Sequence, residues 1–113
     1  MDETTLRLIL DALPFPIVFV DTSHTIRLMN KRAKFHYYEE RGYRDLIGKS
    51  VFECHNETSK ERILKIVEQL KNHGREVFLA VTGKNERLYV TPVRDDAGEL
   101  IGYFERLEGN YQK

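Results

Sequence analysis

The chain contains a single cysteine, Cys54, together with no tryptophan and only three prolines in 113 residues. One cysteine cannot form an internal disulfide bond, and this usage is typical of proteins in a reducing compartment. Long apolar runs are also missing, since the longest, residues 15–20, is far shorter than the ~20 residues that cross a bilayer. The N-terminus is acidic where a signal peptide is basic. We therefore expect a cytoplasmic protein with no membrane contact.

The charges show no excess of either sign, because 18 lysines and arginines balance 18 aspartates and glutamates. Without a basic field the chain has little to attract the phosphates of nucleic acids, and we predict that it binds none. The apolar fraction of 41%, with 11% aromatic residues, is enough for a packed core and excludes an intrinsically disordered chain. A length of 113 residues fits one domain.

Two segments carry the apolar spacing of amphipathic helices, in which residues at i, i+3, i+4 and i+7 share one face. The first consists of Leu6, Ile9, Leu10 and Leu13, and a proline follows it. The second follows a capping box at residues 58–61 and consists of Ile63, Ile66, Val67 and Leu70. A third helix is predicted over residues 31–41, with Asn30 as its N-cap and Gly42 after its end. Ser50 is expected to cap a short helical turn.

Five segments have the β-branched and aromatic composition of strands and are bounded by turn residues. They are residues 17–20, 25–29, 77–82, 87–93 and 100–107. Strands at both ends of the chain with helices between them predict an α+β fold, a five-stranded antiparallel sheet with helices packed on one face. The N-terminal helix, within residues 1–14, lies outside that core, and residues 109–113 form a C-terminal tail.

Five short motifs occur in an order and spacing that resemble a PAS domain. They are IVFVD at 17–21, IRLMN at 26–30, LIGKS at 46–50, TPVRD at 91–95 and GELIG at 98–102. The resemblance covers residues 6–108 and places the PAS domain itself at residues 15–108. It implies a PAS-like fold that either holds a small molecule between the sheet and the helices or relays signals as a ligand-free dimer.

A narrower likeness involves residues 48–56 together with Ser59. This segment is similar to PAS segments found beside hemerythrin-like domains in some bacterial and archaeal proteins. The chain itself contains no hemerythrin-like domain, so the likeness suggests ancestry and leaves the mechanism open.

The PAS resemblance also implies which side chains line the interior. Alternating residues of a strand point to opposite faces of the sheet, so one set faces the helices and the other faces away. The inward strand residues are Val18, Val20, Leu28, Leu88, Val90, Leu100 and Phe104, and the outward ones are Tyr89, Ile101 and Tyr103. The pocket candidates from the helical segments are Phe35, Phe52, Cys54, His55, Ile63 and Val67. The same spacing is expected of a filled core, because interiors are close-packed by default.

Cys54 and His55 form the one pair with reactive potential. Covalent haem attachment needs two cysteines and is excluded. The photoactive flavin adduct of some PAS domains needs a cysteine three residues after the glycine that matches Gly48, where this chain has Val51. Adjacent residues do not supply the four ligands of a zinc site, so we predict no metal site. Non-covalent haem binding stays open, with the cofactor unknown and the histidine being His55, His36 or His73.

These observations predict a PAS sensory or signal-transduction module without catalysis of its own. It would bind a small molecule or a signalling partner protein and relay the state through a helix or dimer rearrangement. The alternatives are a ligand-free dimerisation scaffold and a small enzyme that uses Cys54 or His55. A short isolated helix is marginal in water, so the N-terminal stripe must pack against something. We expect it to cover the outer face of its own sheet or to form a homodimer contact through Leu6, Ile9, Leu10 and Leu13.

Overall fold

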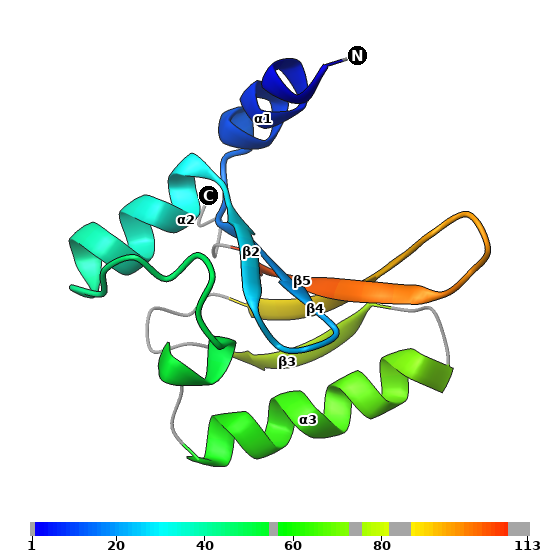
Figure 1. The fold of residues 1–113 in the computed structure, drawn as a ribbon. Helices are drawn as coiled ribbons and strands as arrows, with labels where there is room; N and C mark the ends of the chain where they lie inside the picture. Colours follow the sequence, from blue (N-terminus) through cyan, green and yellow to red (C-terminus); the bar gives the residue numbers. More distant parts are fainter. Residues whose placement is uncertain (1, 55–56, 73–75, 82–86, 109–113) are drawn as a thin grey trace, which may run out of the picture.

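The computed structural model describes residues 2–54, 57–72, 76–81 and 87–108 (Figure 1). Its helices are α1 (Glu3–Ala12), α2 (Lys31–Lys34), the π-helical η1 (Phe35–Glu40), the 3-10 turn η2 (Val51–Cys54) and α3 (Glu57–Asn72). Its strands are β1 (Ile17–Asp21), β2 (Ile26–Met29), β3 (Val77–Val81), β4 (Arg87–Arg94) and β5 (Leu100–Glu108). The strands form one antiparallel sheet in the order β2-β1-β5-β4-β3. The predicted α+β architecture is therefore confirmed.

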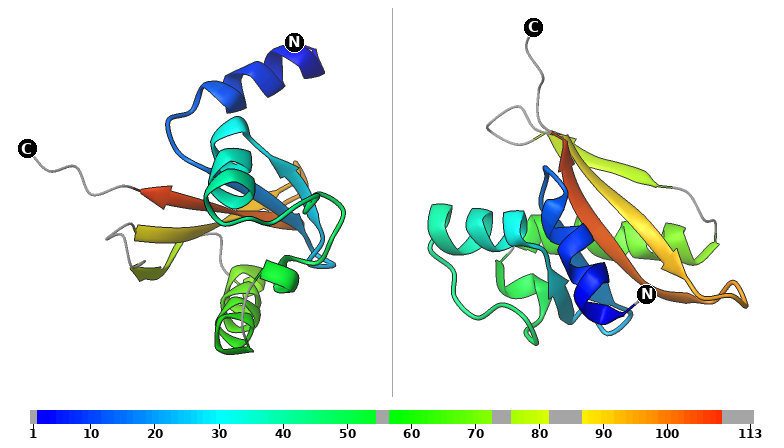
Figure 2. Two further views of the ribbon diagram at one scale, coloured as in Figure 1. Left: turned by 90° about the vertical axis from the view of Figure 1, so that its left-hand side faces the viewer. Right: turned by 90° about the horizontal axis from the view of Figure 1, so that it is seen from above.

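Helices lie on both sides of the sheet. The long helix α3 runs along one face, which we call the inner face, whereas α1 lies on the opposite side and points away from the sheet (Figures 1 and 2). The consecutive helices α2 and η1 lie beside β1 and β2 at one end of the sheet (Figure 1). The core thus forms between the inner face and the helices α3, η1 and η2.

The predicted apolar face of α3 is the part of the core that the helix supplies. Ile63, Ile66, Val67 and Leu70 are all buried, as their spacing predicts. The guanidinium of Arg94 on β4 donates to the backbone carbonyl of Leu70, one of the carbonyls that a helix end leaves without an intrahelical partner. This bond fixes the end of α3 to the sheet.

A β-bulge at Arg27 decides which residues of β2 face the core. Phe19 pairs with Leu28, but the next residue, Val20, pairs with Ile26, so Arg27 is an extra residue in β2. Directly paired residues share a face of the sheet. Leu28 therefore lies on the outer face with Phe19, and the inward position predicted for it is wrong.

A second bulge, at Ile101, has the same effect on β5. The register of β4 against β5 shifts there by one residue. Beyond the shift, Tyr103 pairs with buried Val20 and is itself fully buried, whereas Phe104 pairs with Phe19 on the outer face. The predictions that Tyr103 faces outward and Phe104 inward are both wrong for this reason.

The helix after Asn30 changes type after its first turn. Asn30 caps it as predicted, because its side-chain oxygen accepts from the backbone N–H of Ala33 at 2.9 Å. The α-helical part, α2, then gives way to η1, where the Arg41 N–H donates to the His36 carbonyl five residues earlier at 3.2 Å. Gly42 ends the segment with a φ of 78°, as predicted. The helix predicted over residues 31–41 is thus present, and its second part is π-helical.

Candidate functional site

One closely packed part of the interior lies between β1, β2, β5 and η1. The side chains that line it are Val18, Ile26, Met29, Tyr37, Leu46, Val51 and Glu105. Among these described side chains no space remains in which a water molecule fits. A small molecule enters this part of the interior only if some of them move.

The predicted pocket residues divide according to where the structure places them. Buried in the core, as predicted, are Val18, Val20, Ile63, Val67 and Val90. Half-buried are Phe52 and Leu88, and Phe52 packs against the core. On the outer face of the sheet are Leu28 and Phe104. The side chain of Cys54 and all of His55 lie outside the described residues.

Phe35 is the most exposed of the predicted pocket residues that the structure describes, with 54% of its surface exposed. Ala33 and Tyr37, two positions before and after it, take the buried side of the helix. Phe35 therefore points away from the core and lines a groove beside α1. Its place in the interior pocket was a wrong prediction.

Glu105 is an interior residue that the sequence did not reveal. It pairs with Val18 across β1 and β5, and only 3% of its surface is exposed. A charged residue in a strand is ordinarily expected on the solvent face, but the bulge at Ile101 turns Glu105 to the inner face of the sheet. The carboxyl group of Glu105 thus adds a polar group to an otherwise largely apolar wall.

Tyr38 connects three parts of the wall through its hydroxyl group. The oxygen accepts from the backbone N–H of Leu46 at 3.2 Å, and the O–H points to the sulfur of Met29 at 3.6 Å. These contacts join η1 to the loop before η2 and to β2. A rearrangement of η1 therefore disturbs the interior directly.

His24, a histidine that the sequence did not single out, lies in the turn between β1 and β2. Its ring centre is 5.0 Å from that of Phe52 and 6.4 Å from that of Tyr103. The ring atom Nδ1 is buried and has no hydrogen-bond partner among the described residues. Burial lowers the pKa of His24 below its ordinary value, and the positive charge of Lys71 lowers it further against a smaller opposing effect of Asp21.

Of the three histidines proposed for haem, the structure describes His36. His36 is on η1, with its Nδ1 atom 3.2 Å from a carboxylate oxygen of Glu40. His55 and His73 lie outside the described residues. In the described part of the chain no three His, Cys, Asp or Glu side chains gather into a metal-binding group.

The apolar stripe of α1 is divided between the domain and solvent. α1 packs against α2, and Leu10 and Leu13 are half-buried there. Leu6 and Ile9 are each 49% exposed, and no residue of α1 is fully buried. A groove of about 470 Å³ opens between the two helices and is lined by Asp11, Ala12, Leu13, Pro14, Lys31, Arg32 and Phe35.

Among the described helices, none is both long and apolar enough to cross a membrane.

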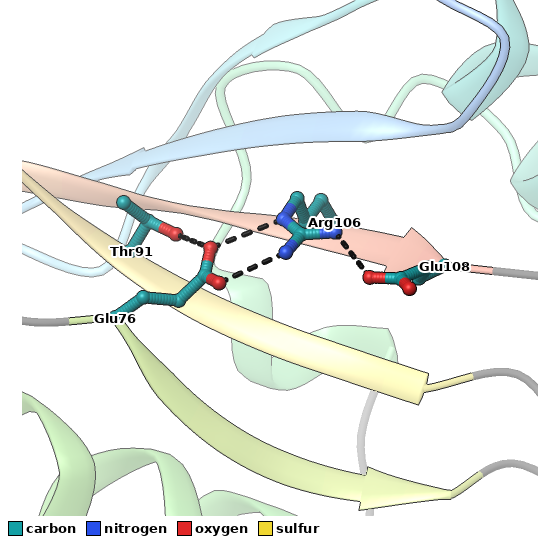
Figure 3. Close-up of polar contacts among 4 residues, drawn as sticks. All are labelled: Glu76, Thr91, Arg106 and Glu108. Atoms are coloured by element: carbon teal, nitrogen blue, oxygen red, sulfur yellow. Dashed lines mark hydrogen bonds and ion pairs between the residues drawn. The ribbon is translucent and has the colours of Figure 1, made fainter.

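The outer face of the sheet carries a polar network around Arg106 (Figure 3). Its Nε and Nη2 atoms donate to the two carboxylate oxygens of Glu76 at 3.0 and 2.9 Å, and its Nη1 atom donates to Glu108 at 3.0 Å. The hydroxyl of Thr91 also donates to Glu76. The guanidinium carbon lies 4.3 Å from the ring centre of Tyr89, within the range of cation–π contacts. This network fastens the start of β3 to β4 and β5.

Comparison with known proteins identifies the family. The family model described as the PAS fold matches residues 10–108, and the chain therefore belongs to the PAS family. No curated protein matches the chain.

Solved structures agree with this fold. A C-terminal domain from Streptococcus mutans is similar with 24% identity and a TM-score of 0.77, over 96% of this chain and 85% of that one. The PAS domain of a protein from Colwellia psychrerythraea has 19% identity and a TM-score of 0.67, over 99% and 100%. A sensory box sensor histidine kinase from Vibrio cholerae has 19% identity and a TM-score of 0.65, over 95% and 90%. At these identities the likeness concerns the fold.

Proposed function

We propose that this PAS domain is a sensory and signal-transduction module without catalytic activity, and that it acts in the cytoplasm through a homodimer contact made by α1. The observation that carries the proposal is the apolar surface that α1 leaves exposed at Leu6 and Ile9. The likeness to a sensor histidine kinase from Vibrio cholerae supports the sensory role. The use of a single cysteine supports the cytoplasmic location.

A second copy of the chain is the partner that this stripe fits. Leu6 and Ile9 lie three positions apart on α1, so their side chains are neighbours on one helix face. Two such faces related by a two-fold axis cover each other with the same residues from both chains. The half-buried Leu10 and Leu13 hold the end of α1 against the domain, so the contact joins the two domains rather than two loose helices.

Small-molecule binding in the interior is the second proposal, and Glu105 is the observation that favours it. A buried carboxyl group in an apolar wall is the kind of polar group that orients a bound molecule. Because the described wall is filled, binding would select a conformation in which Tyr37 or Leu46 has moved. Non-covalent haem and an association with hemerythrin-like domains stay predictions from the sequence.

Native mass spectrometry of freshly purified protein tests both proposals, because it reads stoichiometry and bound mass together. We expect a dimer, and a dimer of two unmodified chains would favour the ligand-free scaffold. A dimer that carries one additional small molecule per chain would support the ligand-binding module instead of the ligand-free one. Monomers without any bound molecule at about 50 μM would contradict both proposals.

A further inference from the structure

Asn30 lies between β2 and α2 and uses every hydrogen bond that its side chain offers. Only 1% of its surface is exposed. The carboxamide oxygen accepts from the backbone N–H groups of Ile17 and Ala33, both at 2.9 Å. The carboxamide nitrogen donates to the backbone carbonyls of Leu10 at 2.9 Å and Phe15 at 3.1 Å. Two donors on one side and two acceptors on the other fix the orientation of the amide.

The two ends of this amide hold different parts of the chain. The oxygen binds the first residue of β1 and the first turn of α2, which both belong to the domain core. The nitrogen binds the last turn of α1 and the linker that follows it. One side chain thus bridges the N-terminal helix and the core.

A second hydrogen bond joins the same two helices. A carboxylate oxygen of Asp11, in the last turn of α1, accepts from the backbone N–H of Lys31 at the start of α2, at 2.8 Å. No residue of α1 is fully buried, so apolar packing alone does not fix the direction of this helix. The polar contacts of Asn30 and Asp11 therefore act together with the half-buried Leu10 and Leu13 in setting it.

We propose that Asn30 is a latch that sets the direction of α1, with its amide nitrogen holding α1 and its amide oxygen holding the core. The first turn of α2 that Asn30 caps carries Ala33, which is fully buried, and continues into Tyr37 in the wall of the interior. A shift of α2 on its core side therefore moves the latch and, through it, α1. The use of this motion in signalling rests on the proposed function, but the latch itself does not.

The substitution Asn30→Asp tests the donor side of the amide apart from its acceptor side. An aspartate keeps both acceptor positions for Ile17 and Ala33, and aspartate and asparagine are comparably good N-caps. It loses both donors, and it places carboxylate oxygens against the carbonyls of Leu10 and Phe15. We expect the core to stay folded while α1 loses its fixed direction.

The measurement is the distance between two spin labels, taken by pulsed electron–electron double resonance in a Cys54→Ser background. One pair, at Arg7→Cys and Lys65→Cys, reports the direction of α1 against α3. A second pair, at Lys65→Cys and Asp96→Cys, reports the core alone. The labelled chains are diluted with unlabelled protein, so that a dimer contributes no distances between chains.

We expect Asn30→Asp to broaden the α1 distance distribution at least about twofold and to leave the core distribution unchanged. The control Asn72→Asp makes the same chemical change at an exposed asparagine on α3 and should change neither distribution. An unchanged α1 distribution in Asn30→Asp, or equal broadening of both pairs, would overturn the latch. If Asn30→Asp does not fold, Asn30→Ser is judged by the same two outcomes. Serine retains an oxygen that can cap α2, but its side chain is too short to donate to the carbonyls of Leu10 and Phe15. No ligand or partner enters the experiment, so its failure is distinct from failure of the proposed function.

Discussion

Arg106 and Glu76 form a two-point ion pair across β4, although 30 residues separate them in the chain (Figure 3). Hydrogen bonding to Arg106 holds the pKa of Glu76 below its ordinary value of 4.5, and that same bond raises the pKa of Arg106. Because the folded state prefers the ionised carboxylate, the stability that Glu76 contributes is present above pH 4.5 and is lost as the pH falls below it.

Glu76→Gln should therefore lower the free energy of unfolding at pH 7 by about 1 kcal/mol or less, since the pair is partly exposed. The same substitution should make the loss of stability below pH 4.5 less steep than in the wild type. Urea unfolding at several pH values measures both effects. The control is Glu68→Gln, which removes an exposed ion pair with Lys71 and should leave the pH profile unchanged. A wild-type acid profile in Glu76→Gln would contradict the role of the pair.

Truncation of the buried face of α3 should be far more damaging than truncation of its exposed face. Ile66 is buried, and Ile66→Ala should lower the free energy of unfolding by about 2–5 kcal/mol. Leu64→Ala, on the exposed face of the same helix, should cost less than about 1 kcal/mol. Urea unfolding of both variants is the measurement. A loss below about 0.5 kcal/mol for Ile66→Ala would be incompatible with this packing.

His24 should make the protein less stable as the pH falls through the ordinary range of histidine. Its folded-state pKa is lowered from 6.5 by burial, so the folded state favours the neutral ring and loses stability as the pH falls below 6.5. His24→Asn should reduce this loss, measured by thermal unfolding from about pH 7.5 to about pH 5.5. Asparagine tolerates the φ of 64° at this position.

The control for that experiment is His36→Asn. His36 lies on η1, where its Nδ1 atom is 3.2 Å from a carboxylate oxygen of Glu40. His36→Asn should therefore show the same loss of stability at low pH as the wild type. If His36→Asn flattens the profile and His24→Asn does not, the assignment of the effect to His24 is wrong.

The reactivity of Cys54 tests the alternative that the chain is a small enzyme. An inert cysteine packed in the domain should react slowly with a bulky thiol reagent in the native protein and quickly in urea. Labelling of the native protein faster than that of a free model thiol would restore the hypothesis of a reactive cysteine.

The sequence predicted most of the fold because local signals marked it. The spacing around Ile66, the cap at Asn30 and the glycine after η1 each act within a few residues, and the structure confirms them. The inner face of the sheet was predicted less well. One extra residue at Arg27 and one at Ile101 reverse the alternation of inward and outward side chains along β2 and β5. The residue types at these positions do not indicate a bulge.

The polar contacts that hold α1 and the start of β3 in place are long-range, which is why the sequence did not reveal them. The amide of Asn30 meets Leu10, 20 residues away, and the pair of Glu76 and Arg106 spans 30 residues. A capping asparagine is visible in the sequence through its acceptor, but the use of its donors depends on where α1 lies. The exposure of Leu6 and Ile9 likewise depends on the direction that α1 takes.

The proposed homodimer forms through the apolar stripe of α1, and the double variant Leu6→Glu/Ile9→Glu places two charges on that stripe. The matched control is Thr4→Glu/Leu8→Glu. At 100° per residue, Thr4 and Leu8 lie on the side of α1 opposite Leu6. Both variants add two carboxylates to the same helix, so a difference between them reports the position of the charge.

Sedimentation velocity of the wild type and both variants at about 50 μM is the most direct test. We expect a dimer for the wild type and for Thr4→Glu/Leu8→Glu, and a folded monomer for Leu6→Glu/Ile9→Glu. A monomeric wild type, or a dimer that survives Leu6→Glu/Ile9→Glu unchanged, would contradict the proposed homodimer.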